Sequence, residues 1–212
     1  MKKRIISAVL AVLILTTSLV SCGGGAHSEE EIRAALEELL PKSFELNEIY
    51  FGKGLPMSSD REKVEEFYSI FDSDVEAVNY HPVDISCGYT TETDIREATL
   101  EVFTADYAEY LFGRAFSGIS ATFNEGEEQE YTSTAVYAMY IEQDGILTVR
   151  INLADEALPL GRVYDLDGME LTENEENFVA VKIPTEMNGR VLDVELRLVL
   201  TPDGWRLDSP TY

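Results

Sequence analysis

The chain has 212 residues, of which 40 are acidic and 16 are basic, and its formal net charge at pH 7 is −24. Such a chain lacks the clustered lysine and arginine that bind phosphate backbones, which excludes nucleic acid as a partner. The length suits a single domain with a sizeable core, and two cysteines are too few for a disulfide-based scaffold.

The first 25 residues have the organisation of a secretory signal. A basic head precedes an apolar run, Ile5 to Leu15, that is too short for the roughly 20 residues of a membrane span. The segment closes on Leu19-Val20-Ser21-Cys22, which resembles the lipobox of bacterial lipoproteins. The resemblance implies cleavage before Cys22 and lipid attachment to its sulfur. Cleavage would remove three basic residues and no acidic ones, and the net charge would become −27.

We therefore predict a signal peptide over residues 1–21, a lipidated cysteine and flexible tether over 22–27, and one domain over 28–212. His27 is expected to be solvated within the tether. An acidic surface is repelled by anionic lipid, so the acyl chains on Cys22 are expected to provide the membrane contact. The expected location is the outer face of the cytoplasmic membrane of a Gram-positive-type bacterium, where we expect a monomer.

Helical patterns dominate residues 28–117. Residues 28–31, Ser-Glu-Glu-Glu, predict a capping box, and apolar residues follow at helical spacing. Pro41 is expected to interrupt this helix, with a second helical stretch ending at Gly52. Further helices are predicted over 91–103 and after residue 104, with Thr93 and Thr104 as N-caps and Gly118 just past the second.

Strand patterns dominate residues 131–212. Asp144-Gly145, Asp167-Gly168 and Asn188-Gly189 each predict a hairpin turn, with a strand over 131–142 before the first of them. The last long strand, 191–200, alternates apolar and charged residues, which predicts one face on a core and one in water. A short strand is expected at 205–207. Helices followed by a mostly antiparallel β-meander predict the α+β class, with a helical half near 28–117.

No pattern in the chain predicts a catalytic residue. There is no Gly-x-Ser-x-Gly motif, and the histidines are His27 and His81 alone. Cys87, the thiol left after lipidation of Cys22, is expected to be a small buried side chain. The shortage of His and Cys argues against zinc, and the acidic runs at 72–76 and 165–168 lack the spacing of a calcium loop. We expect no enzymatic activity, no cofactor and no metal site.

The order of elements resembles a known family. Helices around Asp94 to Phe116 lead to a strand ending Tyr140-Ile141-Glu142-Gln143-Asp144-Gly145-Ile146-Leu147, and the chain closes on Val199-Leu200-Thr201-Pro202-Asp203-Gly204-Trp205-Arg206-Leu207. This pattern resembles the small secreted inhibitors of cell-wall D,L-endopeptidases in Gram-positive bacteria, the cell-separation inhibitors. The resemblance implies a protein without enzymatic activity that occupies the cleft of a peptidoglycan hydrolase. The lipobox in place of a simple signal departs from that family.

No inhibitory residue can be matched by position, so the partner-binding residues are predicted from charge alone. They are the four acidic residues of one loop, which would orient docking onto an electropositive cleft: Glu125, Glu127, Glu128 and Glu130. Helices wrapped by a curved sheet also describe the nuclear-transport-factor-2-like fold, so a ligand-binding envelope lipoprotein is an alternative. A structural envelope lipoprotein is a third. A deep aromatic pocket with a buried carboxylate would favour ligand binding, whereas a convex body without a pocket would favour inhibition.

Overall fold

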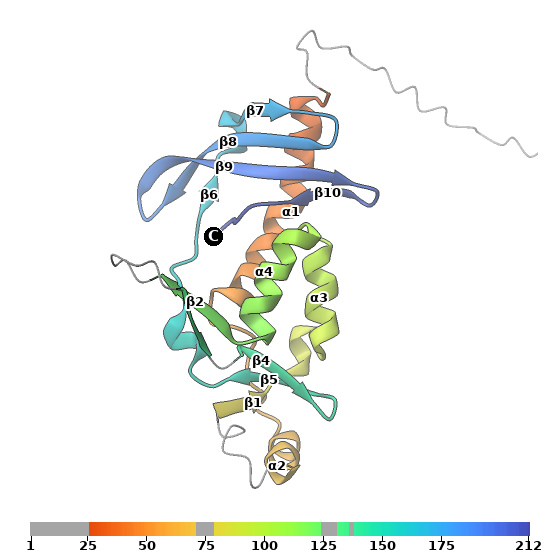
Figure 1. Cartoon of the computed structure of the whole chain (residues 1–212), viewed down its shortest axis with the longest axis vertical. Coiled ribbons are helices and arrows are strands. Elements are labelled where there is room, and N and C mark those ends of the chain that lie inside the picture. Colours follow the sequence, from red (N-terminus) through yellow and green to blue (C-terminus); the bar gives the residue numbers. More distant parts are fainter. Residues whose placement is uncertain (1–25, 71–78, 124–130, 136–137) are drawn as a thin grey trace, which may run out of the picture.

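The computed structural model describes residues 26–70, 79–123, 131–135 and 138–212 (Figure 1). Its α-helices are α1 (Glu29–Tyr50), α2 (Arg61–Ile70), α3 (Glu92–Leu100) and α4 (Ala105–Phe116). Its strands are β1 (Tyr80–Pro82), β2 (Ile119–Phe123), β3 (Tyr131–Ala135), β4 (Tyr140–Gln143), β5 (Ile146–Arg150), β6 (Val163–Tyr164), β7 (Glu170–Asn174), β8 (Phe178–Met187), β9 (Arg190–Thr201) and β10 (Gly204–Leu207). The predicted α+β class is confirmed, because helices come first and antiparallel sheets follow.

The strands form three antiparallel sheets. The largest has the order β10-β9-β8-β6, with β7 also paired to β8; the second is β1-β5-β4, and the third is the β2-β3 pair. Figure 1 shows the largest sheet at one end of the molecule, curled across the first half of α1. The β1-β5-β4 sheet lies towards the other end, where α2 lies beyond it, and α3 and α4 lie between the two sheets.

Helix α1 begins as predicted but does not end at Pro41. The Ser28 hydroxyl accepts a hydrogen bond from the Glu31 backbone N–H at 3.1 Å, which satisfies one donor at the helix start. The Glu31 carboxylate does not complete the capping box; it contacts side chains of other elements instead. The helix continues through Pro41 to Tyr50, so the predicted interruption is wrong. Its buried stripe extends on both sides of the proline, and that packing outweighs one missing hydrogen bond.

The caps of α3 and α4 both involve threonine. Thr91, rather than the predicted Thr93, caps α3: its hydroxyl accepts from Asp94 N–H, and the Asp94 carboxylate accepts from Thr91 N–H, which is a complete capping box. Thr104 caps α4 as predicted, and Gly118 follows the helix with a φ of 61°. The error at residue 93 arose because two threonines two residues apart are equally good caps in sequence.

Two of the three predicted hairpin turns are confirmed. Asp144-Gly145 joins β4 to β5 and Asn188-Gly189 joins β8 to β9, and all four residues have positive φ, as this tight turn requires. The third is wrong: Asp167 and Gly168 lie in a 3₁₀ turn, and the strands on either side, β6 and β7, each pair with β8. The predicted strand 131–142 is two strands, since β3 pairs with β2 and β4 pairs with β5.

Strand β9 follows its predicted alternation only in its second half. Leu196 and Leu198 are fully buried against α1 and its neighbours, as expected. Leu192 and Val191, next to the Asn188-Gly189 turn, are 42% and 72% exposed. The β8-β9 hairpin therefore extends beyond the core that its middle covers.

One apolar core joins residues of α1, α3 and α4 to both larger sheets. Two buried tyrosines make polar bonds within it. The Tyr50 hydroxyl on α1 lies 2.7 Å from the Thr99 hydroxyl on α3, and the Tyr140 hydroxyl on β4 donates to the Ile49 carbonyl at 2.9 Å. These bonds satisfy phenols that would otherwise be buried without partners.

None of the helices in the described residues is both long enough and apolar enough to cross a membrane.

Replacement of Asp94 tests the capping box of α3. Hydrogen bonds from Thr90 and Thr91 lower the pKa of the Asp94 carboxyl to about 2. A lowered pKa in the folded state stabilises the protein above the unfolded pKa near 4, and this stability is lost as the pH falls towards 2. Asp94→Asn should lower the free energy of unfolding by about 1 kcal/mol at pH 7, as loss of a cap typically does. The difference in the free energy of unfolding between Asp94→Asn and the unmodified chain, measured by urea unfolding, should be smaller at pH 3.

Asp106→Asn is the matched control, because Asp106 is also in the first turn of a helix and no described residue donates a hydrogen bond to its side chain. It should lower the free energy of unfolding by less than half as much. Equal losses for the two variants would show that charge near a helix start, rather than the capping box, is what stabilises α3.

Candidate functional site

The residues predicted to contact lipid and partner lie outside the described residues. Cys22 precedes residue 26, and Glu125, Glu127, Glu128 and Glu130 fall within 124–130. Both assignments stay predictions. Cys87 is half-buried rather than buried, and its thiol lies 3.7 Å from the Tyr89 carbonyl.

His81 is part of the packing between α2 and β1. Its Nε2 lies 3.0 Å from the Ser58 carbonyl, and its Nδ1 lies 3.5 Å from the Tyr68 hydroxyl. The same phenol donates to the Tyr80 carbonyl at 3.1 Å. These contacts explain the half-buried imidazole as a link between a helix, a loop and a strand.

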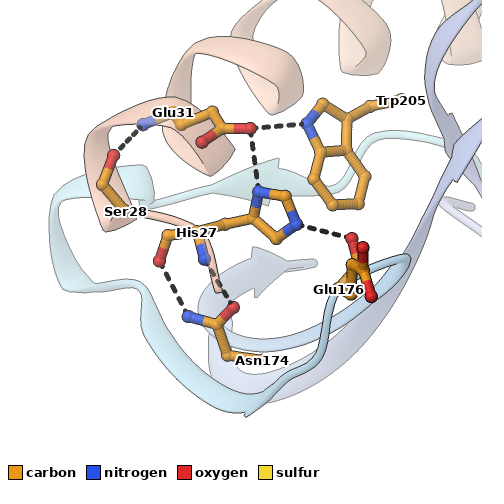
Figure 2. Close-up of polar contacts among 6 residues, drawn as sticks. All are labelled: His27, Ser28, Glu31, Asn174, Glu176 and Trp205. Atoms are coloured by element: carbon orange, nitrogen blue, oxygen red, sulfur yellow. Dashed lines mark hydrogen bonds and ion pairs between the residues drawn. The ribbon is translucent and has the colours of Figure 1, made fainter. Parts of the chain in front are cut away.

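His27 is docked onto the domain, so the expectation that it is solvated is wrong. Its side chain is 12% exposed. The imidazole Nδ1 lies 3.0 Å from a carboxylate oxygen of Glu31 on α1, and Nε2 lies 2.8 Å from the Glu176 carbonyl in the β7-β8 turn (Figure 2). The ring also meets the Trp205 ring on β10 edge to face, with centroids 4.8 Å apart. Residues far apart in the sequence thus meet at the point where the chain enters the domain.

Asn174 and Trp205 complete this contact set. The Asn174 side chain accepts from His27 N–H at 3.0 Å and donates to the His27 carbonyl at 2.8 Å, so one amide holds both backbone groups of the residue. The Trp205 indole N–H donates to the same Glu31 carboxylate oxygen at 3.3 Å (Figure 2). We call these five residues the His27 junction: His27, Glu31, Asn174, Glu176 and Trp205.

The contacts of the His27 junction hold separate parts of the fold together. Both imidazole nitrogens lie within hydrogen-bond distance of an oxygen atom, Nδ1 at 3.0 Å and Nε2 at 2.8 Å. With both nitrogens engaged, the ring presents no nitrogen to a substrate. Three elements and the chain leading into α1 are held together by it.

The His27 junction sets how far the domain can lie from a lipid on Cys22. Five residue steps separate Cys22 from His27, and a fully extended chain covers at most about 18 Å in that length. Figure 1 shows the start of α1 and strand β7 at one end of the molecule and α2 at the opposite end. We call these the junction end and the distal end.

Several open clefts mark the described surface. One of about 200 Å³ lies at the distal end and is lined by Lys63, Tyr89 and Ile146, among others. One of about 370 Å³ lies beside the second half of α1 and includes Phe44, Arg162 and Tyr212. No aspartate or glutamate of the described residues is buried, so the buried carboxylate that would mark a ligand-binding pocket is not found among them.

Exposed apolar side chains lie at the distal end. Ile70 closes α2, and Ile85, which lines the 200 Å³ cleft, is 54% exposed. Large exposed aliphatic residues beside a cleft are typical of surfaces that bind other proteins.

Within the described ranges, His, Cys, Asp and Glu form no group of three or more that could hold a metal ion. Comparison with protein-family models and with curated protein sequences found no match. Any function must therefore be inferred from the geometry and from the sequence patterns themselves.

Sequence reasoning missed His27, Trp205 and Arg162. The Gly-Gly-Gly run before His27 indicated a tether, and nothing local showed that His27 contacts β7, the β7-β8 turn and β10. Trp205 offered one signal, since it is the single tryptophan of the chain and lies in a short terminal strand. Arg162 lies in a segment without a motif.

Replacement of His27 tests the His27 junction, because the fluorescence of Trp205, the single tryptophan of the chain, reports on it. His27→Ala removes the ring packed edge to face on Trp205 and removes the imidazole contact of the Glu31 carboxylate. We expect a red shift of tryptophan emission and a loss of about 1 kcal/mol of stability, the typical net value of one or two hydrogen bonds. Fluorescence and urea unfolding measure the two effects.

His81→Ala is the control. His81 is the other histidine of the chain, and it lies at the distal end, away from Trp205. Its tryptophan emission should match that of the unmodified chain. If His27→Ala also leaves the emission unchanged, His27 does not pack on Trp205 in solution.

Proposed function

We propose that this protein is a lipid-anchored extracytoplasmic binding protein that inhibits a peptidoglycan D,L-endopeptidase. The observation that carries the proposal is the His27 junction. A chain anchored at Cys22 and fastened at His27 would hold the domain close to the membrane with its distal end directed away from it. The distal end would then face the cell wall, where such hydrolases act.

The surface of the distal end supports binding rather than turnover. Its cleft is small and open, and exposed Ile70 and Ile85 offer apolar contact area for a protein partner. The excess of acidic residues would attract an electropositive hydrolase and repel other acidic proteins of the envelope. The four glutamates at 125–130 remain our proposed steering charges.

Fatty-acid labelling tests the anchor. Cells fed a clickable fatty acid should label the unmodified chain, and the mass of the mature protein should correspond to a start at Cys22. Cys22→Ser should abolish the label, because the acceptor sulfur is gone. Cys87→Ser removes the other cysteine and should leave labelling unchanged; an uncut N-terminus or a labelled Cys22→Ser chain would contradict the anchor.

Hydrolase assays test the inhibition. Residues 26–212 are incubated with purified D,L-endopeptidases and peptidoglycan, and muropeptide release is measured. We expect at least one endopeptidase to be inhibited. Conversion of Glu125, Glu127, Glu128 and Glu130 to Gln should weaken inhibition about tenfold at low salt, mainly through slower association.

The matched control converts the same number of charges at the junction end, none of them in the His27 junction, to glutamine: Glu30, Glu170, Glu173 and Glu175. This variant should inhibit like the unmodified domain. Unchanged muropeptide release across a panel of D,L-endopeptidases would refute the inhibitor function and leave the anchor untouched.

A further inference from the structure

Arg162 is one of several described basic residues that form no ion pair, and it differs from the others in its buried Nε–H. Among the described residues, six lysines and arginines form ion pairs with carboxylates at 2.6–3.0 Å: Arg33, Lys42, Arg61, Arg96, Arg150 and Lys182. Arg162 has no carboxylate partner among the described residues, and its guanidinium lies 3.5 Å from the Tyr164 hydroxyl.

The Arg162 Nε–H is buried and has no acceptor among the described residues. Arg150 has a similar buried Nε, but its guanidinium is neutralised by Glu156 at 2.6 Å. A buried guanidinium N–H without an acceptor is costly, and more so when the charge is unpaired. Arg162 therefore has both a free charge and a free donor next to a cleft.

The phenols near Arg162 do not neutralise it. Burial raises the pKa of Tyr164, and burial together with Tyr110 raises that of Tyr212, so both stay uncharged at neutral pH. Burial likewise raises the pKa of Tyr107, which also lies near Arg162. These neutral phenols leave the guanidinium charge uncompensated, so it can attract an anion that enters the cleft.

The cleft beside Arg162 has a volume of about 370 Å³ and a fixed floor. Asn47 on α1 donates to the Thr211 hydroxyl at 2.9 Å, and Thr211 donates to Ser43 at 2.9 Å; all three side chains are almost fully buried. The Tyr164 hydroxyl donates to the Thr211 carbonyl at 3.1 Å. The polar groups of the floor are thus engaged with one another.

The remaining walls combine apolar and acidic side chains. Phe44 on α1 stacks on Tyr164 with centroids 6.1 Å apart, and Tyr212 stacks on Phe51 with centroids 3.8 Å apart. Glu45 and Glu48, also on α1, line the same cleft and form no ion pair with a described residue. One cleft therefore holds a free cation, two free anions and aromatic surface.

We propose that this cleft binds a zwitterionic amino acid or dipeptide, with its carboxylate on the Arg162 guanidinium and its ammonium beside Glu45 and Glu48. A planar guanidinium binds a carboxylate through two parallel hydrogen bonds. The volume lies within the range of small-molecule sites. A polyanion is disfavoured, because the two glutamates would repel its second charge. This site is independent of the proposed anchor and of the proposed hydrolase partner.

Calorimetry on the full chain in nonionic detergent tests the site with the dipeptide Ala-Phe, its N-acetyl derivative and its C-terminal amide. The free dipeptide should bind saturably. Each derivative should bind at least about tenfold more weakly than the free dipeptide, since each lacks one of the two charges that Arg162 or the glutamates would contact. The absence of saturable binding, or equal binding of either derivative, would overturn the proposal.

Substitutions test which residues bind the carboxylate and the ammonium group of the dipeptide. Arg162→Gln should weaken Ala-Phe binding about tenfold, and Arg162→Lys should weaken it less, because charge is kept while the two-bond geometry is lost. Arg190→Gln removes an equal charge at the exposed β8-β9 turn and should change nothing. Glu45→Gln combined with Glu48→Gln should abolish the difference between the free and the N-acetyl dipeptide.

Normal binding by Arg162→Gln would overturn the assignment of the carboxylate. If thermal melting shows that this variant does not fold, the comparison of the three dipeptides on the unmodified chain decides the proposal alone.

Discussion

The burial of one stripe of α1 is the interaction on which the rest of the structure depends. Seven apolar residues of this helix belong to the core: Ile32, Leu36, Leu39, Leu40, Leu46, Ile49 and Tyr50. Each such side chain contributes about 1.5–3 kcal/mol when it leaves water. The first half of the helix lies against the curled sheet, and the second half is bonded to α3 and β4 through Tyr50 and the Ile49 carbonyl. A single helix therefore joins two sheets that do not pair with each other.

The same helix gives the molecule its two ends. At its start, His27 and Glu31 bring together the entering chain, the β7-β8 turn and β10. Its second half forms one wall of the cleft that holds Arg162. The distal end, with α2 and the β1-β5-β4 sheet, lies beyond both. Anchoring, small-molecule binding and protein binding are thus proposed for three separate regions of one body.

Local sequence reasoning succeeded where a few neighbouring residues decide the conformation. Ser28 and Thr104 cap their helices because a side-chain oxygen reaches a backbone N–H three residues later. Asp-Gly and Asn-Gly make tight turns because they tolerate positive φ. It failed where distant packing decides. Pro41 lies within α1 because buried residues continue on both sides of it. Asp167-Gly168 is not a hairpin turn because β6 and β7 each pair with β8 and not with each other.

The sequence by itself determined the α+β class, the N-caps Ser28 and Thr104, two hairpins and the acidic character of the chain, since these follow from local propensity and composition. Only the tertiary structure decided that His27 is fastened to Asn174 and Glu176, and that Arg162 shares a cleft with Glu45 and Glu48. These groups lie more than 100 residues apart in the chain, and no periodicity or motif relates them. Their contacts exist because α1 is buried under a sheet whose strands come from the far end of the sequence.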